Sequence, residues 1–433
     1  MRRWDSKGNT TACFTWAENE MSIEADGERS LIDLAKELIR IPSAASDGDG
    51  IYKFVEKYLQ RKGVDVSRPS VKNPLTHGNT LFNVYSRAGS GKGPKIMINC
   101  HLDTIPMREG WYHLPYDAVE DEGRLYGVGA ADMKGGCAAA ITAFLSFLKK
   151  VPEPKGEVFL SCVYGEESPN PLGTDTLLRE FDLDDYDLII VPEPSPLLAI
   201  NDYCTVHKKI HKSSFPVPII GAEGRALFEI DFFGKAAHAS HPSQGINALH
   251  DAARVITELA RFDLFSNIKM GRGHYVVLNI DGGDQSFTVP SKCRIFVNRQ
   301  LTLGEDDKSV LRELKSIIKS LNIKSKYSIR KRYSPAPDLE YKPYLNEDEP
   351  YIDRFVEMLP KRKAGGSKAQ RCLFTSSSVG DFNLYGTRTK APVLVFGPGG
   401  GNIHAPNEYV NIGDMIQTTN YLLDFLMGVY GDE

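Results

Sequence analysis

The first half of the chain alternates between two hydrophobic patterns. Apolar residues recur at helical spacing in three segments, 30–40, 51–62 and 135–151. Short apolar runs between polar or glycine-rich turns predict strands at 81–85, 95–99, 157–163 and 187–191. The last two of these runs are continuously apolar, which is typical of a sheet that is covered on both faces. The alternation of helices with such strands predicts an α/β domain.

From Arg225 onward the order of the predicted elements changes. The pattern predicts strand, helix, strand, strand, helix and strand at 226–233, 245–261, 275–280, 292–301, 306–321 and 327–332. This β-α-β-β-α-β order is that of a ferredoxin-like domain. The chain then returns to helices at 351–359 and 415–427, with a strand at 393–396 between them. We therefore expect a small domain, residues 221–335, inserted into a large domain formed by residues 26–220 and 336–433.

Composition narrows the class of protein. The 433 residues suit two or three domains, and 52 Lys and Arg against 56 Asp and Glu leave a net charge of −4. This balance gives no electrostatic reason to expect a nucleic-acid partner or a polybasic membrane patch. No apolar run reaches the ~20 residues of a membrane helix. Seven scattered Cys without a C-x-x-C pair argue against a disulfide framework and favour a reducing, cytoplasmic location. Residues 1–25 are polar and aperiodic, without the apolar segment of a signal peptide, and we expect a flexible extension.

Side chains with metal-binding and acid–base chemistry follow the predicted strands of the large domain. The strand-end residues are His101, Asp103, Glu166, Glu167, Glu193 and His404, and Asp132 stands just before the helix at 135–151. In open α/β sheets, ligands bind outside the carboxyl ends of the strands. The two imidazoles and the carboxylates are therefore expected to converge on one rim of the sheet.

Such a group of anions would repel itself unless cations were bound. Nitrogen and oxygen ligands without thiolates suit zinc, and also cobalt or manganese. A carboxylate that bridges two cations makes a two-metal site, with the metals ~3.5–4 Å apart. One further carboxylate that binds no metal is then needed to accept a proton from water. The tandem Glu166 and Glu167 offer both kinds of carboxylate.

These residues, in this order, resemble the two-metal metallopeptidases that include acetylornithine deacetylase, succinyl-diaminopimelate desuccinylase, aminoacylase and glutamate carboxypeptidase. The resemblance runs from about Leu31 to Leu423. It implies a zinc-exopeptidase-like catalytic domain and makes the inserted domain a lid and dimerisation domain of a homodimer. It also implies two divalent ions per chain, most simply zinc. One ion would be held by His101, Asp132 and Glu193, and the other by Asp132, Glu167 and His404, so that Asp132 bridges them.

The same resemblance assigns three further roles in the large domain. Glu166 would be the general base and acid, and Asp103 would orient His101. A cis peptide bond is expected between Asp132 and Met133. Gly399 lies in the glycine-rich segment 397–401, which resembles the substrate loop of the family.

In the inserted domain, the resemblance points to His238, which would reach the active site of the partner subunit and bind the oxyanion. His241, three residues away, is the alternative, and either His could be a surface residue. Arg299, with Asn298 beside it, stands where the family often places an anchor for a substrate carboxylate. A plain salt bridge within the small domain is the competing interpretation of Arg299.

The sequence thus predicts a hydrolase that cleaves an amide or peptide bond next to a free carboxylate, in a small N-acyl amino acid or short peptide. An aminopeptidase of the same fold is one alternative, and a non-catalytic binding protein that kept the fold is another. The basic segment 207–212 either shapes a substrate pocket or decorates the surface.

Overall fold

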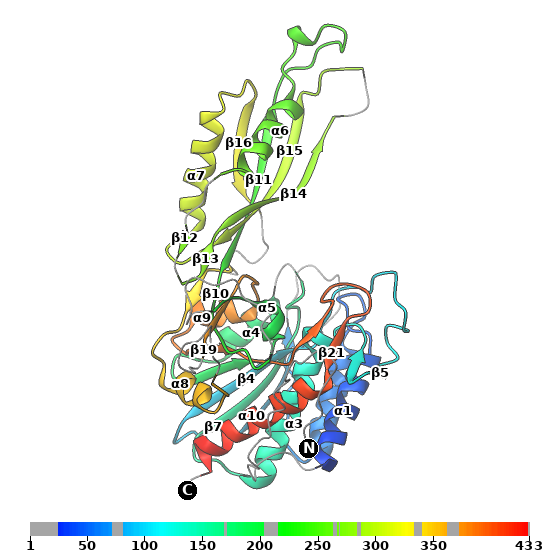
Figure 1. Ribbon diagram of the computed structural model, residues 1–433, viewed down its shortest axis with the longest axis vertical. Coiled ribbons are helices and arrows are strands. Elements are labelled where there is room, and N and C mark those ends of the chain that lie inside the picture. The colour runs from blue at the N-terminus through cyan, green and yellow to red at the C-terminus, as the bar shows by residue number, and fades with distance from the viewer. Residues whose placement is uncertain are drawn as a thin grey trace, which may run out of the picture.

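Two domains of unequal size meet at one end of the smaller one, which projects from the larger (Figure 1). The computed structural model describes residues 25–71, 81–168, 171–202, 215–262, 266–267, 269–283, 287–332, 340–361 and 372–431. The expected extension over residues 1–25 lies outside this set apart from Ala25, and so does the basic segment 207–212.

A nine-stranded sheet forms the centre of the large domain. Its order is β3-β7-β4-β8-β19-β10-β18-β9, and β17 also pairs with β10. Strands β7, β4, β8 and β19 are mutually parallel, so their carboxyl ends lie along one edge. The strands are β3 (Val84–Ala88), β4 (Lys95–His101), β7 (Glu157–Val163), β8 (Leu188–Val191), β9 (Ala199–Asp202), β10 (Ile219–Ala222), β17 (Tyr344–Leu345), β18 (Phe374–Ser376) and β19 (Val393–Val395).

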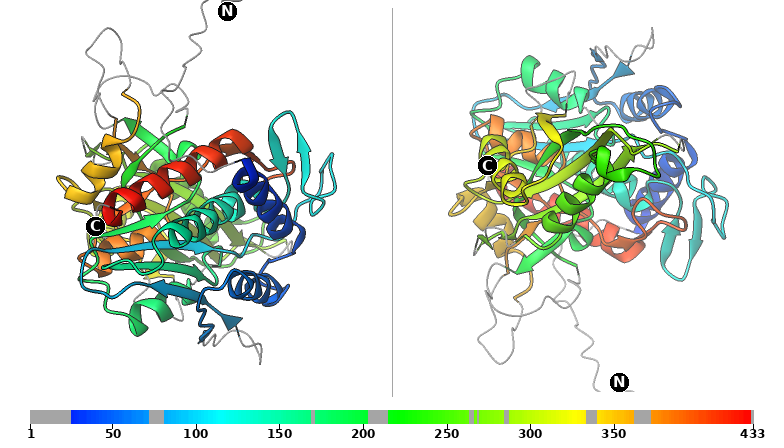
Figure 2. Two further views of the ribbon diagram at one scale, coloured as in Figure 1. Left: turned by 90° about the horizontal axis from the view of Figure 1, so that it is seen from below. Right: turned by 90° about the horizontal axis from the view of Figure 1, so that it is seen from above.

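Helices cover both faces of this sheet, and Figure 2 shows α3 and α10 on one face and α4 on the other. Alternate residues of β4 enter different cores: Ile96 and Ile98 join one hydrophobic cluster, whereas Met97 joins the other. This two-sided burial explains why the strand sequences are apolar at successive positions. The helices are α1 (Ala25–Arg40), α2 (Gly50–Arg61), α3 (Gly135–Lys150), α4 (Leu172–Glu180), α5 (Ser195–Leu198), α8 (Pro350–Glu357), α9 (Asp381–Arg388) and α10 (Ile412–Tyr430).

A second, four-stranded sheet at the rim of the large domain has the order β20-β21-β6-β5. In this sheet, β21 pairs on one side with β20 of the glycine-rich segment near residue 400. On its other side β21 pairs with β6, which precedes the π-helical turn η1 (Ala130–Lys134). Its strands are β5 (Val119–Asp121), β6 (Arg124–Tyr126), β20 (Gly400–Gly401) and β21 (Tyr409–Asn411). Two further short pairs lie among the described residues: β1 (Ser70–Val71) with β2 (Leu81–Phe82), and β12 (Ser266–Asn267) with β13 (Gly271–Arg272).

The small domain confirms the predicted ferredoxin-like order. Its antiparallel sheet has the order β14-β15-β11-β16, and α6 and α7 bury one face around residues such as Phe228, Ile295 and Leu314. The elements are β11 (Gly224–Phe233), η2 (Pro242–Gln244), α6 (Ala248–Leu259), β14 (His274–Gly282), β15 (Lys292–Leu301), α7 (Asp307–Ser320) and β16 (Lys326–Lys331). No helix among the described residues is both long and apolar enough to span a bilayer.

The first crossing between the domains lies at Glu223. Strand β10 of the large sheet ends one residue before it, and β11 of the small sheet begins one residue after it. The buried side chain of Asn383 donates to the backbone carbonyls of Glu223 and Lys342, at 2.9 and 2.8 Å. Gln300 Nε2 of the small domain donates to the carbonyl of Ser377 in the large domain. These three hydrogen bonds hold the base of the small domain.

The Glu223 carboxyl makes the stability of this crossing depend on pH. It is 2% exposed, and burial raises its pKa from the ordinary 4.5 to about 7. The folded state therefore binds this proton more tightly than the unfolded state does. The resulting contribution to the free energy of unfolding is fully present below pH 4.5 and is lost as the pH rises through about 7. We predict that Glu223→Gln increases the free energy of unfolding at pH 8 by up to about 3 kcal/mol, and by much less at pH 5.

Urea unfolding of both proteins at the two pH values measures this difference. The exposed Glu153 supplies the control variant, Glu153→Gln, which should change little at either pH. Equal effects of Glu223→Gln at pH 5 and pH 8 would contradict the prediction.

Candidate metal centre

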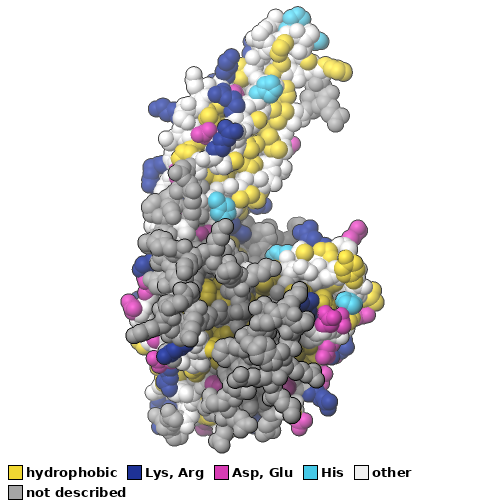
Figure 3. Space-filling view, in the orientation of Figure 1, with side chains coloured by type: hydrophobic (Ala, Val, Ile, Leu, Met, Phe, Trp, Pro, Cys, Tyr) yellow, Lys and Arg dark blue, Asp and Glu magenta, His cyan; other side chains and the backbone are white. Residues whose placement is uncertain are grey.

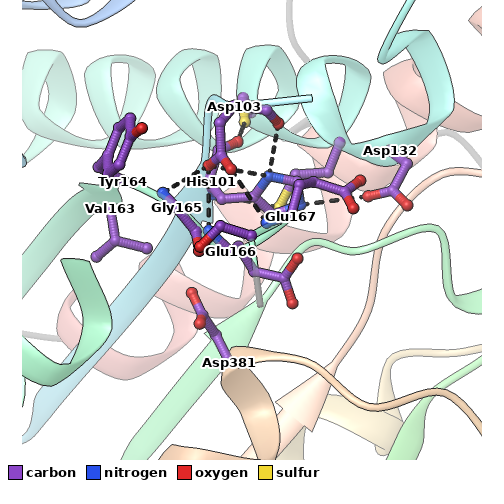
Figure 4. Close-up of polar contacts among 12 residues, drawn as sticks. His101, Asp103, Asp132, Val163, Tyr164, Gly165, Glu166, Glu167 and Asp381 are labelled. Atoms are coloured by element: carbon purple, nitrogen blue, oxygen red, sulfur yellow. Dashed lines mark hydrogen bonds and ion pairs between the residues drawn. The ribbon is translucent and has the colours of Figure 1, made fainter. Parts of the chain in front are cut away.

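The predicted ligands come together at the carboxyl edge of the large sheet, where Figure 4 shows His101, Asp132 and Glu167 near one another. His101 is the last residue of β4, Glu167 follows β7 and Glu193 follows β8. Asp132 lies in η1 before α3, and His404 lies between β20 and β21. Because the parallel strands end at one edge, residues that are far apart in sequence become neighbours.

His101 pairs with two of these carboxylates. Its Nε2 lies 3.2 Å from Asp132 Oδ1 and 3.1 Å from Glu193 Oε1. The imidazole is buried, and its Nδ1 lies 3.0 Å from the backbone oxygen of Asp103, which fixes the ring so that Nε2 faces the carboxylates. These three side chains are the predicted ligands of one metal.

His404 completes a second trio on the other side of Asp132. Its Nε2 lies 2.8 Å from Glu167 Oε1 and 3.4 Å from Asp132 Oδ2. The backbone of His404 is left-handed, with a φ of 61°, which is uncommon for a residue with a side chain. Asp132 thus presents one oxygen to each imidazole, as a bridging carboxylate does.

Glu166 lies inside the same cluster. One ligand atom each from His101, Glu166 and Glu193 lie within 4.8 Å of one another, as do those of His101, Asp132 and Glu167. Burial, together with the charges of Asp381, Glu193 and Glu167, raises the pKa of the Glu166 carboxyl well above its usual range. A carboxyl with a raised pKa beside a cation site suits proton transfer.

The pKa values of several groups in the cluster are raised, because carboxylates outnumber imidazoles there. Burial and the charge of Asp132 raise the pKa of Glu193 to about 8. Hydrogen bonds to Asp132 and Glu167 raise the pKa of His404 to about 10, and against the opposing effect of burial the Glu193 carboxylate raises that of His101. Divalent cations would relieve this charge, and the donor set of imidazoles and carboxylates without thiolates fits zinc, cobalt or manganese.

Asp103 acts mainly on the turn that carries the two glutamates. Its Oδ1 accepts hydrogen bonds from the backbone N–H groups of Gly165 and Glu166, at 2.9 and 3.3 Å, and its Oδ2 accepts one from Glu167 at 3.0 Å. Its carboxylate lies 3.8 Å from His101 Nδ1, farther than its own carbonyl. Asp103 therefore holds the 165–167 turn with its side chain and His101 with its backbone.

The backbone around the site has two special features. The peptide bond between Asp132 and Met133 is cis, as expected. A Cβ atom on Gly397 would lie 2.2 Å from the carbonyl oxygen of Pro192 and 2.4 Å from that of Glu193. Only glycine fits there, so the segment 397–401, which contains the buried Gly399, packs directly on the loop that carries Glu193.

His238 lies away from these ligands. It is exposed, and its Nδ1 lies 2.7 Å from Ser240 Oγ. The segment 234–247, between β11 and α6, is at the end of the small domain that points away from the large one (Figure 1). Within one chain, His238 is therefore not brought to the cluster.

Acidic partners of the small domain surround Arg299, which was expected to anchor a substrate carboxylate. The side chain is fully buried and forms ion pairs with Glu305 and with Glu313, the latter at 3.4 Å. Its guanidinium also donates to the carbonyl of Gln300. These partners match the competing interpretation, a salt bridge inside the small domain. The neighbouring Asn298 keeps a buried Oδ1 without a hydrogen-bond partner among the described residues.

Two buried carboxyls of the site were not predicted from the sequence. Asp381, at the start of α9, lies below Glu166 in Figure 4, and burial raises its pKa to about 6. Glu408 accepts hydrogen bonds from the turn that carries Asp132. Neither follows a predicted strand, so the pattern of strand ends did not point to them.

Comparison with curated proteins gives relatives over nearly the whole chain. Succinyl-diaminopimelate desuccinylase of a Nitratiruptor species is 25% identical over 382 residues, which cover 87% of this chain and 94% of the relative. The enzyme of the same name from Methylorubrum extorquens (strain PA1) is 25% identical over 422 residues, covering 93% of this chain and 98% of the relative.

Solved structures show the same fold. A tripeptidase from Staphylococcus aureus subsp. aureus mu50 superposes with a TM-score of 0.69 at 20% identity, covering 94% of this chain and 99% of that one. An M20 family metallo-carboxypeptidase from Sulfolobus solfataricus has a TM-score of 0.69 at 16% identity, covering 93% and 99%. The model of peptidase family M20/M25/M40 matches residues 97–428. The chain therefore belongs to this family of metal-dependent peptidases, which are hydrolases that act on C–N bonds.

Proposed function

We propose that this protein hydrolyses the amide or peptide bond next to a free carboxylate in a small N-acyl amino acid or short peptide. The observation that carries the proposal is the position of Asp132 between His101 and His404, each with its own further carboxylate. Relatives named succinyl-diaminopimelate desuccinylase, matched over most of both chains, support an acyl amino acid as the substrate class.

The proposed cofactor is a pair of divalent ions, with zinc in first place and cobalt or manganese as alternatives. His101, Asp132 and Glu193 would hold one ion, and Asp132, Glu167 and His404 the other. When bound, such ions polarise a carbonyl oxygen and lower the pKa of water. The residues around them determine which groups can approach and where protons go.

Glu166 is the proposed proton carrier. Its carboxylate takes a proton from the attacking water and returns it to the nitrogen of the leaving amine, so that the N–C bond breaks with a neutral amine as product. The position of the Glu166 main chain supports this role, because Asp103 accepts its N–H and fixes the turn. The carboxylate of the adjacent Glu167 contacts His404 and is a proposed metal ligand, so Glu166 is the one of the two glutamates that is available for proton transfer.

A homodimer through the small domain is the second part of the proposal. Strand β14 is at the edge of its sheet and exposes an apolar row, Val276, Leu278 and Ile280, with exposed fractions of 41, 57 and 45%. Apolar side chains run along this part of the small domain in Figure 3. A free, apolar edge strand favours pairing with another copy. Pairing of two chains would also let His238 reach a metal centre other than its own.

Glu166→Gln should retain the metals and lower kcat by about 10²–10⁴-fold, because the amide cannot accept the proton of the attacking water. The assay compares N-acyl amino acids that have a free carboxylate with the same compounds blocked as C-terminal amides. Wild-type protein should hydrolyse the first group and discriminate against the second.

Other outcomes favour the alternatives. Faster hydrolysis of C-blocked dipeptides with a free amine, relative to N-blocked dipeptides, would support an aminopeptidase. Inactivity on the whole panel with both metals bound would support a binding protein. Full activity of Glu166→Gln would refute the role of Glu166.

Asp132→Ala should remove most of the bound metal, because both proposed sites lose a ligand at once. Elemental analysis after dialysis against limiting zinc measures the metal content of each chain. The expected result is about two ions for the wild type and fewer than one for the variant. Two ions retained by Asp132→Ala would contradict the bridging role.

Mixing chains tests the contribution of His238 from the partner. Glu166→Gln and His238→Ala homodimers should each have low activity, whereas exchanged heterodimers contain one site with both native residues. We expect activity to recover towards about a quarter of the wild-type value, because statistical exchange makes half of the dimers heterodimers and each has one native site of two; mass spectrometry verifies the exchange. No recovery despite proven exchange, or a monomeric wild type, would refute the proposal.

A further inference from the structure

Glu408 makes an unusual set of contacts for a residue outside the predicted site. It is 3% exposed and lies four residues after His404, just before β21. Its Oε1 accepts hydrogen bonds from the backbone N–H groups of Ala131 and Asp132, at 2.9 and 3.0 Å. Its Oε2 accepts one from Gly129 at 2.9 Å. One buried carboxylate therefore takes three N–H donors from a single turn.

The turn needs such an acceptor. Gly129 is left-handed, with a φ of 73°, and Asp132 and Met133 have non-helical backbone angles inside η1. N–H groups at the start of a helix have no carbonyl of the same helix to bond, and an unpaired buried N–H is costly. The Glu408 carboxyl group satisfies three of these donors, and their hydrogen bonds offset part of the cost of burying it.

Lys134 fixes the other end of the turn. Its side chain is fully buried, and its Nζ donates to the carbonyl of Ile41 at 2.9 Å. The backbone adds a further bond, from Gly127 N–H to the carbonyl of Glu408 at 3.0 Å. The turn with Asp132 and the loop with His404 are thereby joined.

We propose that Glu408 is a positioning residue for the metal centre. By holding the 129–132 turn against the loop of His404, it sets the Asp132 carboxylate between the two imidazoles. The proposal rests on the metal-binding part of the proposed function and not on the substrate. Asp103 offers an internal precedent, since its carboxylate holds the 165–167 turn by three backbone N–H groups in the same way.

The test substitutes Glu408→Gln in the full-length protein and measures zinc affinity by competition with a chromogenic chelator, without substrate. The amide keeps one acceptor oxygen and turns an NH₂ group towards a backbone donor, so the turn loses at least one of its bonds. We expect zinc affinity to fall about 10–100-fold. In the metal-free protein, the amides of 129–132 should also exchange hydrogen faster than in the wild type.

Asp251 supplies the matched control. It is a buried carboxylate of the small domain whose Oδ2 accepts the backbone N–H groups of Lys324 and Ser325, at 3.2 and 2.8 Å. Asp251→Asn should leave zinc affinity and the exchange of 129–132 unchanged. An equal loss of zinc affinity in this variant would show a general effect of weakened folding and would overturn the proposal.

Glu408→Asp is the second variant, for use if Glu408→Gln does not fold. It keeps the charge but withdraws the carboxylate by one methylene, and a smaller loss of zinc affinity is expected. A folded Glu408 variant with zinc affinity within about threefold of the wild type and unchanged exchange would overturn the proposal. Since neither readout involves hydrolysis, failure of the proposed reaction and failure of the positioning role are distinguishable.

Discussion

The concentration of carboxylates at one edge of a parallel sheet is the constraint on which the rest of the structure depends. Asp132, Glu166, Glu167 and Glu193 lie around two imidazoles, and burial with mutual repulsion raises the pKa of three of these four carboxyls. Of the four, only Asp132, which both imidazoles contact, has a lowered pKa. Cations bound between these groups would offset the repulsion between the carboxylates. The close approach of the carboxylates therefore favours metal binding.

Backbone N–H groups provide the scaffold that keeps these carboxylates in place. The ligands lie on turns, where main-chain groups lack regular partners, and each of two such turns surrounds a buried carboxylate that binds no metal in the proposed arrangement. Asp103 organises the turn with Glu166 and Glu167, and Glu408 organises the turn with Asp132. The site thus contains more carboxyl groups than its proposed ligand set, and two of them accept hydrogen bonds from main-chain N–H groups.

The sequence predicted those features that follow from periodicity and strand direction. The apolar runs gave the parallel strands, whose ends necessarily converge, and the element order of the small domain was correct. The places of Glu408 and Asp381 were missed, because they depend on tertiary hydrogen bonds. The short strands β10 and β18 were also missed. The position of Arg299 on β15 was predicted, whereas its ion pairs with Glu305 and Glu313 depend on tertiary packing.

The two domains divide the proposed chemistry unequally. Every proposed metal ligand and Glu166 come from the large domain, whereas His238 belongs to the distal end of the small domain. Hydrogen bonds of Asn383 and Gln300 hold the base of the small domain, while its distal end projects away from the large domain. Metal binding would therefore need only one folded chain, while stabilisation of an oxyanion by His238 would need a second. Assembly of two chains would then control catalysis without altering the metal centre itself.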